Sequence, residues 1–156
     1  MSSIRSLTFV ALIALAAPAA SVFAQARPHV AMTPAELKWG PAPPVLPAGA
    51  QIAVLDGDPT KEGFFTIRLK FPDGYKIAPH WHPTDENITV VAGTFLMGVG
   101  EKRNDAALHA LPAGSFTIMP KTGRHYASAK GETIVQIYGQ GPFVVNYVNP
   151  ADNPTK

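Results

Sequence analysis

Two histidines and one glutamate stand close together in the stretch HWHPTDE, and their spacing suits a metal site. His80 and His82 are separated by one residue, and Glu86 follows four residues later. Side chains alternate between the faces of a β-strand, so a strand here points both histidines the same way and Trp81 the other. The intervening Pro-Thr-Asp favours a turn, after which Glu86 opens the next strand. Two imidazoles and a carboxylate on one face match the ligands of divalent transition metals; the alternative is a pair of surface histidines beside a solvated glutamate.

The composition of the chain excludes several other kinds of chemistry. The sequence contains no cysteine, so any metal is held by nitrogen and oxygen ligands, and no thiol nucleophile or disulfide is available. The only serines after residue 24, Ser115 and Ser128, lie outside a G-x-S-x-G setting. The net charge of +2 falls to +1 when Arg5 is removed with the N-terminal segment. Such a balance gives no electrostatic basis for binding nucleic acid or an anionic membrane.

The N-terminal segment has the features of an export signal. A basic residue, Arg5, precedes the apolar run LTFVALIALAAPA, and small residues follow around Ala24 and Ala26. The apolar run is shorter than the about 20 residues that a transmembrane helix needs. We therefore expect residues 1–24 to be a signal peptide, cleaved after Ala24 or Ala26, and the mature protein to be periplasmic or secreted without a membrane anchor.

The remaining chain divides into a proline-rich arm, a β-rich domain and a short polar tail. The arm, residues 25–50, contains at most one helical turn, in which Thr33 is a suitable cap and Pro34 a suitable first residue. Residues 51–148 alternate short β-branched and aromatic runs with turn signals, which predicts an all-β sandwich or barrel. The predicted strands are QIAVL, GFFTIRLKF, NITVVAG, TFLMGVG, SFTIMP, ETIVQIYG and PFVVNYV. Residues 149–156 form the tail.

The wider spacing around the two histidines resembles the first cupin signature. Gly74, His80, His82, Glu86 and Gly93 follow the pattern G-x5-H-x-H-x3-E-x6-G. The two glycines stand at expected turns, where a positive φ is unstrained only for glycine. Five fixed positions make this a specific match.

A second stretch, GSFTIMPKTGRHYASA, resembles the second cupin signature, G-x5-P-x-G-x2-H-x3-N. Gly114, Pro120 and His125 keep their spacing, whereas Gly123 stands one position late and Ala129 replaces the usual asparagine. The resemblance thus supplies a third histidine, His125, and covers about residues 51 to 148.

The resemblance implies a cupin-type double-stranded β-helix, or jelly-roll, barrel. It further implies that His80, His82, Glu86 and His125 converge on one divalent metal ion: iron, manganese, zinc, nickel or copper. Cupins often form homodimers, and the proline-rich arm is a candidate to pack across the sheet edge of a second copy.

Several functions are compatible with such a centre. The preferred prediction is a metal-dependent oxidoreductase of the dioxygenase type acting on a small organic molecule. A non-redox isomerase or lyase is one alternative, and a non-catalytic metal- or ligand-binding module, such as a sensor or partner protein, is another. Tyr138 and Gln136 share a strand face and are candidates for catalytic contacts; a strand face turned to solvent is the alternative for both. Polar groups beside the metal would favour an enzyme, whereas closure by Phe95 or Met97 would favour a binding module.

Overall fold

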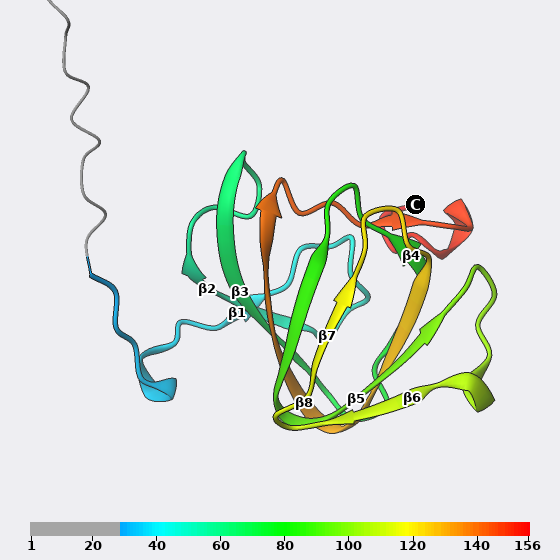
Figure 1. The fold of residues 1–156 in the computed structure, drawn as a ribbon, viewed down its shortest axis with the longest axis horizontal. Helices are drawn as coiled ribbons and strands as arrows, with labels where there is room; N and C mark the ends of the chain where they lie inside the picture. The colour runs from blue at the N-terminus through cyan, green and yellow to red at the C-terminus, as the bar shows by residue number, and fades with distance from the viewer. Residues whose placement is uncertain (1–28) are drawn as a thin grey trace, which may run out of the picture.

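The computed structural model describes residues 29–156, which form a barrel of β-strands (Figure 1). The predicted signal peptide, residues 1–24, and both of its cleavage points lie outside the described residues. Among the described residues, no helix has the length and apolar character needed to cross a membrane.

Nine strands and three short 3-10 helices make up the described chain. In chain order they are η1 (Pro34–Glu36), β1 (Gly40–Pro41), β2 (Gln51–Asp56), β3 (Gly63–Phe71), β4 (Lys76–Trp81), β5 (Glu86–Val99), η2 (Asp105–Ala107), β6 (His109–Pro112), β7 (Phe116–Met119), β8 (His125–Gly141), β9 (Asn146–Tyr147) and η3 (Pro150–Asp152). The sequence prediction of an all-β domain is confirmed.

Two long bent strands, β5 and β8, connect the two walls of the barrel. The first part of β5 pairs with β7 and its last part with β6. The first part of β8 pairs with β4 and its last part with β3, while β5 and β8 pair with each other along most of their length. The strand order in one wall is therefore β1-β2-β3-β8-β5-β7, with the last part of β8 and the first part of β5. The order in the other wall is β9-β4-β8-β5-β6, with the first part of β8 and the last part of β5. Figure 1 shows the resulting curled sheet, with its interior between the walls.

Gly93 permits the bend in β5. Its φ is +72°, and a Cβ at this position would collide with the carbonyl oxygen of Glu132 and with Thr133. The ladder to β8 is irregular on both sides of Ala92. The two strands predicted from NITVVAG and TFLMGVG are therefore one strand, because the glycine bends the chain without ending the pairing.

The C-terminal prediction was partly wrong. The run PFVVNYV forms a strand only at Asn146–Tyr147. Pro142 has no N–H to donate to a ladder, and the chain after it bonds elsewhere: the N–H of Phe143 donates to the carbonyl of Pro59 at 2.7 Å. Strand β8 also begins earlier than predicted, at His125, and His109–Pro112, which lies outside the predicted strands, forms β6.

The proline-rich arm packs on its own chain. Strand β1 pairs with β2, and Leu46 and Ala50 are each only 6% exposed within the core. The Tyr75 hydroxyl donates to the carbonyl of Pro47, and the Tyr147 hydroxyl to that of Val45. The arm therefore protects the β2 edge and core of its own molecule. The expected homodimer remains a prediction.

The predicted turn at the start of the arm is present as η1. Both the N–H and the hydroxyl of Thr33 donate to the Glu36 carboxylate, at 2.7 and 2.8 Å, and Pro34 is the first helical residue.

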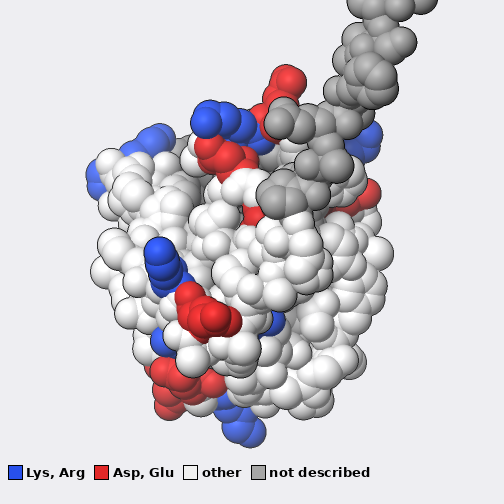
Figure 2. Space-filling view, turned by 90° about the vertical axis from the view of Figure 1, so that its left-hand side faces the viewer, with Lys and Arg blue, Asp and Glu red and all other residues white. Residues whose placement is uncertain are grey.

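On the face of the molecule drawn in Figure 2, positive and negative side chains lie near one another, and much of the surface carries no charge.

Candidate metal centre

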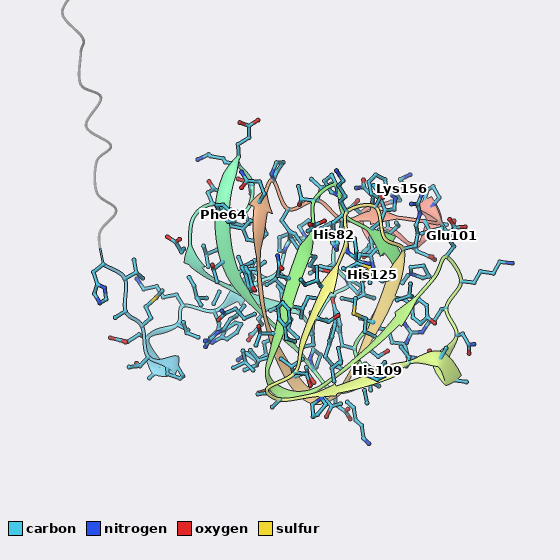
Figure 3. The ribbon with its side chains drawn as sticks, viewed as in Figure 1. Phe64, His82, Glu101, His109, His125 and Lys156 are labelled. Carbon is cyan, nitrogen blue, oxygen red and sulfur yellow. The ribbon has the colours of Figure 1, made fainter. Side chains whose placement is uncertain are left out.

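Strand ends bring the three motif histidines and the glutamate together inside the barrel. His80 lies in β4 and is paired with His125, the first residue of β8. His82 stands one residue beyond the end of β4, and Glu86 is the first residue of β5. All four are buried, with 2 to 6% of their surface exposed. Figure 3 shows His82 and His125 near one another, with the exposed His109 at the opposite end of the barrel.

The geometry of these four side chains fits a metal ion. One ring nitrogen from each of His80, His82 and His125 lies within 4.8 Å of the other two. The Glu86 Oε2 atom lies 3.4 Å from His82 Nε2 and 3.3 Å from His125 Nε2. His82 Nε2 and Glu86 Oε2 are nevertheless buried without a hydrogen-bond partner. Because an unsatisfied buried polar atom is costly, a cation shared between them would supply the missing partner, and nitrogen and carboxylate donors suit a divalent transition metal.

Backbone carbonyls fix the protonation of all three imidazoles. The Nδ1 atoms of His80, His82 and His125 lie 2.8, 2.7 and 3.0 Å from the carbonyl oxygens of Ala78, Val144 and Gly123. A carbonyl only accepts, so each Nδ1 carries the hydrogen. In the neutral form of each ring, the lone pair therefore lies on Nε2. This is the arrangement by which outer partners orient histidine ligands toward a metal.

Electrostatics favour the cation-binding forms of His80 and Glu86. Burial, together with the neighbouring His125 and His82, lowers the pKa of His80 to about 3, so this ring is neutral. Burial raises the pKa of Glu86, but contacts with His82 and His125 outweigh it and hold that pKa below its usual range. For His82 burial acts downward, and the Glu86 carboxylate outweighs it, so the pKa is raised. The carboxylate is therefore ionised and available to a cation.

The cavity beside the cluster is small and otherwise apolar. Its volume is about 20 Å³, and every described lining residue except the three histidines and Glu86 is apolar. The Phe143 ring stacks on His82, with centroids 4.8 Å apart and planes at 17°. Phe95 lines the cavity, whereas Met97, also buried, does not. No further acid or base stands beside the cluster among the described lining residues.

Two of the predicted contacts, Gln136 and Tyr138, lie away from the cluster. They alternate along β8 with Val135 and Ile137, which line the cavity, so they occupy the opposite face of the strand. The Gln136 Oε1 atom accepts a hydrogen bond of 3.1 Å from Arg68 Nε. The structure does not bring these two side chains to the histidines.

Three features of the site were missed by sequence reasoning. The carbonyl of Val144 orients His82, the ring of Phe143 covers it, and Leu46 from the arm lines the cavity. A backbone acceptor leaves no trace in residue type. Leu46 carried a faint signal as a large apolar residue among prolines and alanines.

Solved structures with a similar fold include cupins and enzymes. A putative acetylacetone dioxygenase from Methylibium petroleiphilum PM1 matches with a TM-score of 0.61 and 18% identity, over 83% of this chain and 88% of that one. The polyketide cyclase RemF from Streptomyces resistomycificus matches with a TM-score of 0.59 and 14% identity, over 83% and 89%. An RmlC-like cupin from Shewanella frigidimarina matches with a TM-score of 0.56 and 18% identity, over 73% and 91%. At these identities the likeness establishes the fold, which is the predicted cupin jelly roll.

The sequence itself matches one family model. No curated protein matches the chain by sequence at a significant level. The model described as "Domain of unknown function (DUF4437)" matches residues 32–154, which include the arm from residue 32 onward and the whole barrel. The chain is therefore a cupin-fold member of the DUF4437 family.

Proposed function

We propose that this protein is a metal-dependent oxidoreductase of the dioxygenase type, acting on a small organic anion bound beside one divalent metal ion. His80, His82, Glu86 and His125 would hold the ion. The observation that carries this proposal is the set of buried, pre-oriented imidazoles that face an ionised carboxylate without satisfying it. The similarity to a putative acetylacetone dioxygenase adds support at the level of fold.

The charge of such a centre would select an anionic ligand. Three neutral imidazoles and one carboxylate around a divalent ion leave a net charge of +1 in a cavity whose other walls are apolar. A buried charge is costly unless it is paired, so an enolate, a catecholate or a carboxylate is the favoured partner. When bound, the metal would supply Lewis-acid chemistry and, if it were iron, copper or manganese, redox chemistry with dioxygen.

The residues of the chain have mainly positioning and shielding roles in this proposal. No described lining residue outside the cluster can accept a proton, so the substrate arrives ionised or releases its proton to solvent on binding. The imidazole Nδ1 hydrogens are held by carbonyls and stay in place. Phe143, Phe95 and the aliphatic wall keep water from the reacting atoms, which strengthens electrostatic contacts within the cavity.

A non-catalytic binding module is the second candidate. It is favoured by the cavity volume of about 20 Å³ and by the position of Phe95 in its wall. Such a module would bind the metal but turn over no substrate. We further propose, on the sequence of residues 1–24, that either form of the protein acts after export, in the periplasm or outside the cell.

Oxygen consumption by the metal-loaded protein separates the candidates. The mature protein is purified from its exported compartment and mixed with catechols and 1,3-diketones in an oxygen electrode. A His125→Ala variant tests the site, and His109→Ala, a substitution of an exposed histidine, is the matched control. Oxygen uptake that is lost only in His125→Ala supports the oxidoreductase. A bound metal without oxygen uptake contradicts it and favours the binding module or, with zinc or nickel, non-redox chemistry.

A further inference from the structure

A second cavity adjoins the metal centre. Its volume is about 140 Å³, and it shares four wall residues with the smaller cavity, namely Leu46, Leu69, Phe143 and Val145. Its remaining wall comes from the arm, the β2 and β3 strands and the Pro59–Thr60 turn. Thr60 is the only polar residue among the described residues that line it.

The volumes of the two cavities indicate how a ligand is divided between them. A space of about 20 Å³ is suited to one water molecule or one small ligating group, since about 10–15 Å³ is the minimum for a water. A space of about 140 Å³ approaches the volume of an apolar cavity that binds benzene. An organic ligand that reaches the metal therefore needs the second cavity for the rest of its atoms.

The second cavity also joins the interior to the surface. Among the residues that line it, Ile67 is fully buried and Leu69 is 3% exposed, whereas Pro43 and Thr60 are exposed. Phe143 and Leu46 stand where the two cavities adjoin, because both residues line each of them. A ligand that enters past Thr60 would have to pass Leu46 and Phe143 to present one end to the histidines.

We propose that this cavity is the subsite for an apolar substituent of the substrate, of the size of a phenyl ring or a short alkyl chain. The ligand class is therefore a small chelating anion with one apolar end. The inference rests on the proposed function for the anionic end of that ligand. No charged side chain lines the subsite among the described residues, so a charged substituent would lose its hydration without gaining a partner.

Hydrogen bonds hold the wall of the subsite in place. The Tyr147 hydroxyl donates to the Val45 carbonyl at 2.8 Å, and the N–H of Phe143 donates to the Pro59 carbonyl at 2.7 Å. The carbonyl of Val144, the residue that follows Phe143, orients His82. The same short segment thus shapes the subsite and positions a candidate ligand, as expected of a largely preformed pocket.

Two diketones and one filling substitution test the subsite. The probes are 2,4-pentanedione and 1-phenyl-1,3-butanedione, which share the chelating group and differ in the apolar end; their affinities for the metal-loaded protein are measured by calorimetry. We expect the phenyl compound to bind at least about tenfold more tightly, because it buries more apolar surface. Val45→Phe narrows the cavity and should weaken the binding of 1-phenyl-1,3-butanedione more than that of 2,4-pentanedione, so that the difference between them falls. Val91→Phe, at a position that is 39% exposed and lines neither cavity, should retain it.

A probe without a chelating group separates the two proposals. Toluene, added to the protein in an NMR titration, should shift the methyl signals of Ile52 and Ile67, which line the cavity. Ile52→Phe, a second filling variant, should abolish the shift of the Ile67 signals. Equal affinity for the two diketones, or no response to toluene, overturns the subsite. If neither diketone binds while toluene does, the proposed function fails and the apolar site stands.

Discussion

Replacing Glu86 by glutamine tests the one anionic ligand of the proposed centre. The carboxylate is buried, and its Oε2 atom lies 3.3 and 3.4 Å from two imidazole nitrogens. Glutamine keeps the shape of the side chain and removes the charge. The contact with His82 also changes in the metal-free protein, so the quantity to compare is the stabilisation that metal adds to each variant, measured against the same variant without metal.

The expected magnitude follows from linkage between binding and folding. At a free metal concentration 100 times the dissociation constant, metal should stabilise the wild-type protein by about 2.7 kcal/mol. Loss of a group that hydrogen-bonds to a metal ligand lowers the metal affinity about 10- to 100-fold. Loss of an ionised ligand itself should therefore lower the affinity by at least about 100-fold. A 100-fold weaker site at the same metal concentration is half occupied, and the stabilisation falls to about 0.4 kcal/mol.

Urea unfolding with and without metal measures this difference. Glu132→Gln, a substitution of an exposed glutamate, is the matched control and should keep the full stabilisation by metal. If Glu86→Gln also kept it, the carboxylate would not be a ligand, and the charge argument for an anionic substrate would fail with it.

Three further outcomes are expected. Burial raises the pKa of Tyr147 to about 12, above the value of about 10 for tyrosine in an unfolded chain. The contribution of this pKa difference to the free energy of unfolding is therefore fully present below pH 10 and is lost as the pH rises through about 12. The phenolate absorbance step near pH 12 should be missing in Tyr147→Phe. Gly98→Ala would place a Cβ against the buried Tyr126 ring and should lower the free energy of unfolding, measured with urea, by about 1–3 kcal/mol. Gly40→Ala, with open space around its Cβ, is the control and should lower it less. An equal loss of stability in the two variants would contradict the packing argument. Gln136→Ala should leave the metal content unchanged, and loss of metal would contradict its placement on the outer face of β8.

The sequence predicted those parts of the structure that depend on local pattern. Alternation along a strand placed His80 and His82 together, and the turn after them placed Glu86 at the start of β5, as found. Strand β3 was predicted with its observed bounds, because it is bordered by glycine and by a Pro-Asp-Gly turn.

Features that depend on long-range contacts were not predictable in this way. The separation of Gln136 and Tyr138 from the cluster follows from which face of β8 turns inward, and that is decided by the strands on either side. The position of the arm depends on hydrogen bonds to carbonyls of Val45 and Pro47. A carbonyl is present at every residue, so such contacts leave no pattern in the sequence.

The most direct test of the account is the metal content of the protein purified from the organism that makes it, measured by elemental mass spectrometry. The double variant His82→Ala, Glu86→Ala is measured beside the wild-type protein. The account predicts close to one transition-metal ion per chain in the wild-type protein and loss of that ion in the variant. A wild-type protein without metal, or a variant that keeps its metal, would contradict the assignment of these residues as ligands.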